Sequence, residues 1–207
     1  TQYTIVEIFL TMVGIKNLSI FIHGHRVDGE IAPQQVFLYD FGNSYIAVLG
    51  EERALPAYPL NTFFEMGFNP STGSDAPVCK PDPWPNLYTM ITRKTWNGTV
   101  MDASQRVSIE RALQAYTENS AFSQNAEQVK GRLIPGQLAD IAVFSRDMLT
   151  ADPEDILNDT HCIMTLLGGD VVYQAGVEQS GNDREHNNKE NHQMLKSLTL
   201  TASLLID

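Results

Sequence analysis

The sequence predicts an α/β fold, and three observations lead to that prediction. Residues 68–74 read as a short strand that runs into a turn of small residues and presents Asp75 at its C-terminal end. Ser108 suits the N-cap of a helix over residues 109–118, whose apolar side chains share one face. The Gly168-Gly169 pair separates two apolar runs, which is a strong signal for a β-hairpin.

Upstream of Asp75 the expected elements are short. The sequence predicts a strand over residues 19–22, a helix over residues 33–41 and a helix over residues 60–66. The N-terminal run from Thr4 to Val13 fits either a helix or a strand. The first part of the chain is therefore expected to mix helices with short strands.

Downstream of Asp75 we expect a helix over residues 87–95, preceded by a Pro-rich turn that contains Trp84. Ile141 to Phe144 is an apolar run bounded by polar and turn residues, and residues 162–167 are apolar enough for a buried strand. Trp84 could line a pocket together with Tyr88, but packing around the turn explains both aromatic residues better. Asp140 is better explained as a turn or capping carboxylate than as a catalytic one.

The C-terminal part of the chain differs in composition from the rest. Residues 178–193 are almost wholly polar, which predicts a disordered linker. Residues 194–206 turn apolar again and fit a short helix that packs elsewhere, or a tail unrelated to the fold.

Asp75 is the main candidate for chemistry. The C-terminal ends of strands are where (β/α)8 barrels hold their catalytic groups. A carboxylate in that position can ligate a divalent metal or accept a proton from metal-bound water. The alternative is an Asp that caps a turn or the next helix, as Asp often does in loops.

Several motifs surround Asp75 in a specific order. They are Leu-Gly-Glu-Glu-Arg at 49–53, Gly-Ser-Asp-Ala-Pro-Val at 73–78, Asp-Pro at 82–83, Thr-Arg at 92–93, Ala-Leu-Gln-Ala-Tyr-Thr at 112–117, and Gly-Gln-Leu-Ala-Asp at 136–140. In this order they resemble the amidohydrolase superfamily, and more narrowly the branch that includes N-substituted formamide deformylases. The resemblance runs from about Leu49 to Tyr173.

The resemblance implies a partial metal-dependent hydrolase (β/α)8 barrel, of which the last strands are present, followed by a β-sandwich segment of the composite domain. The implied domains are residues 1–125 for the barrel part, 126–175 for the β-sandwich return, and 176–207 for a polar tail with an apolar end. The resemblance also assigns Asp75 to strand eight, as an aspartate of the metal centre and a proton shuttle.

Two histidines are further metal-ligand candidates. His23 and His25 follow an apolar run, and their spacing places both imidazoles on one face of a strand. The superfamily carries such a pair on strand one, but Asp75 lies only roughly 50 residues later and one βα unit needs about 30. The better match is the strand-six histidine, for which His23 fits slightly better, although Ile22 stands where an acidic residue is usual. A histidine pair at a loop mouth without metal remains the alternative.

The chain is short for a complete barrel. Between Gln35 and Leu49 the family would hold a helix end, strand seven and a loop, so Tyr45 to Val48 supplies a degenerate strand seven or a segment has been lost. A (β/α)8 barrel alone takes about 250 residues, whereas this chain has 207. The resemblance therefore implies that upstream strands are missing.

Composition and charge limit the classes of partner that the chain is expected to bind. A hydrophobic content of 43% can support a buried core. The net charge of −11 argues against nucleic acid and disfavours anionic membranes as partners. Cys79 and Cys162 have no metal or disulfide spacing and read as ordinary thiols. No signal peptide or membrane span is seen, which favours a cytoplasmic location without fixing the compartment.

Two functional hypotheses from different classes follow. The first is a metal-dependent hydrolase of carbon–nitrogen bonds other than peptide bonds, with Asp75, His23 and His25 at a divalent metal, which is expected to be zinc, and a small amide-like substrate. The second is a non-catalytic remnant or a subunit that completes a partner chain. Unpaired barrel strands would favour association, including a homo-oligomer.

Overall fold

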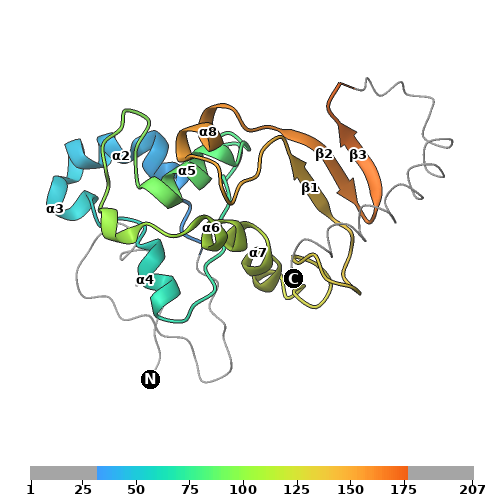
Figure 1. Ribbon diagram of the computed structural model, residues 1–207. Coiled ribbons are helices and arrows are strands. Elements are labelled where there is room, and N and C mark those ends of the chain that lie inside the picture. Colours follow the sequence, from blue (N-terminus) through green and yellow to red (C-terminus); the bar gives the residue numbers. More distant parts are fainter. Residues whose placement is uncertain (1–31, 177–207) are drawn as a thin grey trace, which may run out of the picture.

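The computed structural model describes residues 32–176, which form a helical region and a three-stranded sheet beside it (Figure 1). The predicted elements within residues 4–22, both histidines His23 and His25, and the segments over 178–193 and 194–206 lie outside the described residues. The described range contains both helices and strands, but between residues 32 and 75 it contains helices and no strand, so the mixture expected for the first part of the chain is not seen there.

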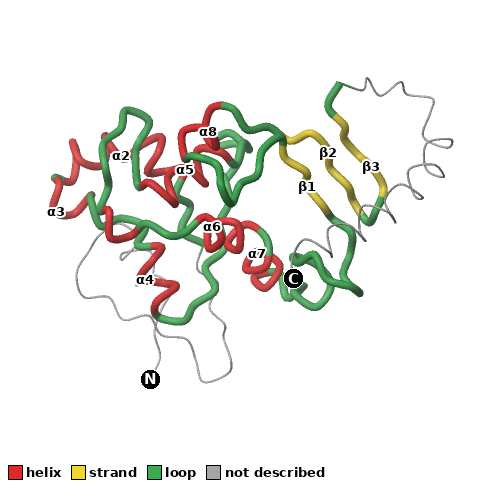
Figure 2. The backbone as a smooth tube through the Cα atoms, in the orientation of Figure 1, coloured by secondary structure: helices red, strands yellow, loops and turns green. Residues whose placement is uncertain are grey.

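Most of the described helices come first along the chain, and the strands follow with one helix between the first and the second of them (Figure 2). The helical elements are α2 (Val36–Leu49), α3 (Glu51–Ala54), α4 (Leu60–Glu65), α5 (Trp84–Thr92), the 3-10 turn η1 (Ala103–Gln105), α6 (Ile109–Tyr116), α7 (Glu118–Ser123) and α8 (Pro153–Asn158). The strands are β1 (Ile141–Phe144), β2 (Cys162–Leu167) and β3 (Asp170–Gln174). Among residues 32–176, no helix is both long and apolar enough to cross a membrane.

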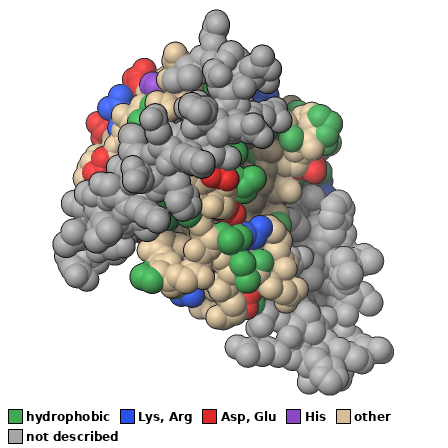
Figure 3. Space-filling model, turned by 90° about the vertical axis from the view of Figure 1, so that its right-hand side faces the viewer, with side chains coloured by type: hydrophobic (Ala, Val, Ile, Leu, Met, Phe, Trp, Pro, Cys, Tyr) green, Lys and Arg blue, Asp and Glu red, His purple; other side chains and the backbone are tan. Residues whose placement is uncertain are grey.

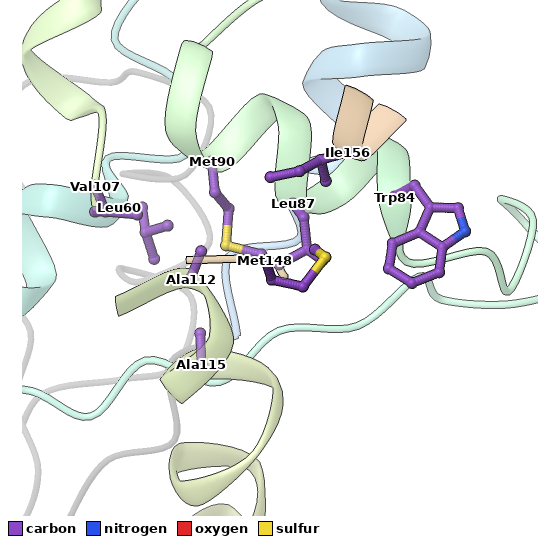
Figure 4. Packing of buried hydrophobic residues seen from close by; sticks show 9 residues of the cluster. All are labelled: Leu60, Trp84, Leu87, Met90, Val107, Ala112, Ala115, Met148 and Ile156. Atoms are coloured by element: carbon purple, nitrogen blue, oxygen red, sulfur yellow. The ribbon is translucent and has the colours of Figure 1, made fainter. Parts of the chain in front are cut away.

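The main core forms where α5, α6 and α8 meet. Leu87 and Met90 of α5 are buried against Ala112 of α6 and Ile156 of α8 (Figure 4). The remaining buried members of this cluster are Leu60, Trp84, Val107, Ala115 and Met148. The core therefore centres on α5, the helix that follows the Pro-rich turn.

Two aromatic residues link α5 to its neighbours. The Trp84 ring lies edge-on to Phe144 of β1, with 5.1 Å between ring centroids, and so joins the helical region to the sheet. Tyr88 is buried, and its hydroxyl donates to Oε1 of Glu154 on α8 at 2.8 Å. The expectation that Trp84 and Tyr88 act in packing is confirmed.

Helix α6 begins at the residue that the sequence predicts. The Ser108 hydroxyl accepts a hydrogen bond from the Arg111 N–H at 3.4 Å, which is the side-chain contact of an N-cap. Of the predicted apolar face, Ala112 is buried, and Ile109, Leu113 and Tyr116 are partly buried against the main core. Ala115, which was not predicted for this face, is buried as well.

The sheet is antiparallel with the order β1-β2-β3. Gly168 and Gly169 form the hairpin turn between β2 and β3 with φ values of 59° and 94°, which glycine adopts without strain. The Asp140 carboxylate accepts from the Gly168 N–H at 2.7 Å. The predicted hairpin and the turn role of Asp140 are both confirmed.

One face of the sheet carries exposed apolar side chains. Leu167 lies on the same side of β2 as Thr165, because successive side chains alternate between faces, and Ile163 is exposed at the bulge where β2 pairs with the end of β1. Tyr173 joins Leu167, since it pairs with Thr165 across the ladder. These three side chains, which we call the outer sheet patch, are 37%, 62% and 47% exposed in that order. On the side of the molecule nearest the sheet, hydrophobic side chains reach the surface in separate groups (Figure 3).

Two predicted barrel strands are absent from the described residues. Residues 68–74 form an irregular segment, because Pro70 has no N–H to donate and side chains of neighbouring helices bond its carbonyl groups. Residues 45–48 belong to α2, which continues past the predicted end at residue 41 until Gly50 turns the chain at φ 77°. The strands of residues 32–176 all belong to the antiparallel sheet, so the predicted barrel part is not seen there.

Other boundaries shift by a few residues. Helix α5 begins at Trp84, inside the expected turn, because Pro83 and Pro85 fit the first helical turn. Residues 153–158 form helix α8, and Pro153 fits the first turn of this helix, where a proline without an N–H is tolerated.

Candidate functional site

Asp75 lies at the tip of a loop that crosses the surface between α4 and α5. We define the Asp75 loop as residues 70–79. Its tip is a tight turn in which the Val78 N–H donates to the Asp75 carbonyl oxygen at 2.8 Å. Asp75 has a left-handed backbone with φ 53°, and its side chain is exposed. The carboxylate is therefore presented to solvent by a turn, where the sequence predicted a strand end.

Buried asparagines hold the base of this loop. The Asn119 side chain of α7 donates to the Pro70 carbonyl oxygen at 3.0 Å. The Asn86 side chain of α5 donates to the Thr72 hydroxyl at 3.0 Å and to the Gly73 carbonyl oxygen at 3.1 Å. Asn86 and Asn119 are 0% and 1% exposed. The loop is thus attached to two helices through backbone and side-chain oxygens just before its tip.

Tyr116 completes the contacts around Asn86. The Asn86 amide nitrogen also donates to the Tyr116 hydroxyl oxygen at 2.7 Å. Burial raises the pKa of Tyr116 to about 12, so the phenol stays protonated at neutral pH. The hydroxyl and the loop therefore share one amide group as their donor.

Cys79 closes the far end of the loop. Its side chain is 4% exposed, whereas Asp75 four positions earlier is exposed. Burial raises the pKa of the Cys79 thiol to about 11, and the carboxylates of Asp40 and Asp75 raise it further because they disfavour a nearby thiolate. Cys79 is a neutral packing residue at neutral pH, as its sequence context predicted.

Asp75 is the one predicted ligand within the described range. Across residues 32–176, no three His, Cys, Asp or Glu side chains are grouped so that they could hold a metal ion. The other predicted ligands, His23 and His25, lie outside that range. The described residues thus supply one of the predicted metal ligands, the exposed carboxylate of Asp75.

Sequence reasoning missed the most polar buried group of the region. Arg93 is 0% exposed and has a left-handed backbone with φ 60°. Its guanidinium donates to the carbonyl oxygens of Ala57 at 2.7 Å, Tyr58 at 3.0 Å and Met101 at 2.6 Å. It also donates to the side-chain oxygen of Gln35. Burial lowers the pKa of Arg93 to about 10.

The bonds of Arg93 tie together three segments that are far apart in sequence. They join the start of α2, the connection before α4 and the segment before η1. Arg93 belongs to the Thr-Arg motif, but a single Arg after a helix gives no sign in the sequence that it will be buried. In the described structure it joins these segments to the end of α5, the helix whose Asn86 bonds the Asp75 loop.

Comparison with known proteins identifies relatives along most of the chain. The sequence profile of an amidohydrolase family matches residues 25–173. A putative amidohydrolase, YtcJ of Bacillus subtilis, is 30% identical over 167 residues, which cover 74% of this chain and 31% of that protein. The N-substituted formamide deformylase of Arthrobacter pascens is 24% identical over 120 residues, which cover 58% of this chain and 22% of that protein.

A plant protein and a solved structure add to this comparison. Protein LONG AFTER FAR-RED 3 of Arabidopsis thaliana is 28% identical over 139 residues, which cover 66% of this chain and 23% of that protein. The crystal structure of an uncharacterized metal-dependent hydrolase from Pyrococcus horikoshii superposes with a TM-score of 0.52 at 24% identity, over 62% of this chain and 26% of that one. The chain thus spans less than a third of the length of each relative.

Proposed function

The chain belongs to the amidohydrolase family, and on that premise we propose that it serves in metal-dependent hydrolysis of carbon–nitrogen bonds other than peptide bonds. The observation that carries the proposal is the position of Asp75. Its carboxylate is exposed at the tip of an anchored loop and lies inside the range that matches the family. An exposed, fixed carboxylate is available to a cation or to a proton in transfer.

The proposed role of Asp75 follows from carboxylate chemistry. A carboxylate oxygen can ligate a divalent cation, and it can accept a proton from a water molecule that attacks an amide. A bound divalent metal supplies a more acidic water and polarises the substrate carbonyl. We assign Asp75 to these two tasks, and His23 and His25 to the cation as further ligands.

Zinc is the proposed metal, since zinc accepts nitrogen and oxygen ligands together. Asp75, His23 and His25 would reach the three protein ligands that catalytic zinc sites commonly use. The proposed substrate is a small amide-like molecule. The similarity to a deformylase of N-substituted formamides supports that choice of substrate class.

Zinc content tests the proposal. Purified wild type should hold close to one zinc per chain by elemental analysis, and Asp75→Asn should bind zinc at least about tenfold more weakly, because one ligand charge is lost. Asp159→Asn, which makes the same change at an exposed carboxylate of the α8 end, should keep its zinc. Circular dichroism would first establish that all three proteins are folded.

Hydrolysis of small amides provides the second readout. Activity should depend on zinc and fall in Asp75→Asn, in His23→Asn and in His25→Asn, but not in Asp159→Asn. A folded wild type with neither zinc nor amide hydrolysis would contradict the proposal.

The outer sheet patch favours a second candidate function. Leu167 and Tyr173 are 62% and 47% exposed on one face of a small sheet, and exposed apolar faces of this kind mark sites of protein association. Under this proposal the chain is a non-catalytic remnant or a subunit that completes a partner chain, including another copy of itself. Light scattering at increasing concentration would detect self-association, and a strictly monomeric, zinc-loaded, active chain would contradict this second proposal.

A further inference from the structure

The side-chain amide of Asn86 has more hydrogen-bond acceptors around its nitrogen than it has N–H groups to offer. Its amide nitrogen has three acceptors within 3.1 Å, namely Thr72, Gly73 and Tyr116, although an amide carries two N–H bonds. Its side-chain oxygen is buried and accepts no hydrogen bond from the described residues. Leaving a buried carbonyl without a donor is costly, so this side chain is turned toward the loop at the expense of its own oxygen.

The acceptor at Gly73 explains this orientation. A backbone carbonyl oxygen can only accept, so it requires the N–H side of the Asn86 amide. Asn119 follows the same rule, since its amide donates to the carbonyl of Pro70. The two asparagines come from different helices, α5 and α7, and they bond the chain two and five residues before Asp75.

From these contacts we infer that Asn86 and Asn119 are positioning residues, which clamp the base of the Asp75 loop so that the Asp75 carboxylate is held outward in one place. Cys79 packs the other end of the same loop, so the tip is fixed from both sides. The use of the clamp in catalysis rests on the proposed function, whereas the clamp itself does not.

The thiol of Cys79 provides a direct test, because the buried side chain reacts only when the loop opens. In a Cys162→Ser background, Cys79 is the remaining cysteine. We expect Asn86→Asp to speed its reaction with a thiol reagent by about 10- to 100-fold, since a carboxylate cannot donate and repels the carbonyl of Gly73. Thr72→Val, which removes one acceptor and keeps the shape, should give a smaller increase.

A stability-matched control separates local opening from general destabilisation. The control is Ile156→Val or Ile156→Ala, whichever has a free energy of unfolding in urea closer to that of Asn86→Asp. Ile156 is fully buried in the main core, a cluster to which no residue of the Asp75 loop belongs. Cys79 of the control variant should react more slowly than that of Asn86→Asp. Low urea should leave the rate of Asn86→Asp unchanged, because a local opening exposes little surface.

Hydrogen exchange read by peptide gives a signature that a merely structural role would not produce. Asn86→Asp should speed exchange in residues 70–79 while residues 162–174 of the hairpin stay protected. Equal Cys79 reactivity in Asn86→Asp and its matched control, or faster exchange throughout the chain, would overturn the inference.

Zinc content distinguishes a failure of the proposed function from a failure of the positioning role of Asn86. If wild type holds zinc, Asn86→Asp should lower zinc affinity and the matched Ile156 variant should not; unchanged affinity would overturn the positioning role. If wild type holds none, the proposed function fails and the Cys79 and exchange results alone decide whether the clamp exists.

Discussion

In the helical region the fully buried side chains include Arg93, Asn86 and Asn119, each bonded to backbone carbonyl groups, whereas in the sheet Leu167 and Tyr173 are 62% and 47% exposed. The helical region buries polar side chains whose N–H groups have partners, although the buried side-chain oxygen of Asn86 accepts no hydrogen bond from the described residues. The sheet leaves apolar groups at the surface. The base of the Asp75 loop therefore depends on specific polar contacts, whereas the outer sheet patch presents exposed apolar side chains.

The largest effect is expected at Arg93. Arg93→Met removes the donor of several buried carbonyl oxygens at once, so the free energy of unfolding should fall by more than about 4 kcal/mol. Urea unfolding followed by circular dichroism measures this loss. Arg132→Met is the control, because that half-exposed side chain makes a single ion pair with Glu118 at 3.5 Å and should cost less than about 1 kcal/mol. Similar losses for both variants would show that the helical region does not depend on its buried polar groups.

A smaller effect is expected from the ionisation of Cys79. Its pKa is raised to about 11, whereas a thiol in the unfolded chain ionises near pH 8.5. The stabilisation is fully present below about pH 8.5 and is lost as the pH rises toward 11, because the unfolded state releases its proton first. Wild type should lose about 1 kcal/mol more than Cys79→Ala between pH 7.5 and 9.5.

Urea unfolding at several pH values measures this difference. The pH range of this experiment ends below the pKa values of the buried tyrosines. Burial raises these values, and that of Tyr116 reaches about 12. Parallel pH profiles for wild type and Cys79→Ala would mean that the Cys79 end of the loop is open to solvent, and would remove that end from the comparison.

The smallest effect on stability is expected in the outer sheet patch. Leu167→Ser should change the free energy of unfolding by at most about 0.5 kcal/mol, because the side chain is already exposed. Leu166→Ser, one position earlier and 3% exposed, should cost about 2 kcal/mol or more. Thermal unfolding gives both values. If Leu167→Ser is as destabilising as Leu166→Ser, the patch is part of a core and the contrast between the two regions disappears.

Local signals in the sequence were enough for some elements. The Gly168-Gly169 hairpin and the Ser108 N-cap were predicted because each depends on neighbouring residues alone. Strand 68–74 was predicted wrongly for the opposite reason. Whether an extended segment becomes a strand depends on a neighbouring strand, and the carbonyls of Pro70 and Gly73 are bonded by helix side chains instead.

The candidate site divides in the same way. Asp75 was found from its motif, and its roles in metal binding and proton transfer stay predictions, as do those of His23 and His25. Asn86 and Asn119 were missed, because an Asn inside a helix gives no sign of the carbonyl that it will meet far along the chain. Only the three-dimensional contacts relate them to the loop.

The backbone of Asp75 limits which amino acids evolution or a mutant library can place at the loop tip. At φ 53°, asparagine and glycine are the natural alternatives to aspartate, whereas branched residues such as valine would be strained. Asparagine also keeps the size of the side chain. The exchange of Asp for Asn at this position therefore removes the negative charge and keeps the shape of the side chain. A library restricted to these residue types would show which effects come from the chemistry of the side chain and which from the backbone conformation.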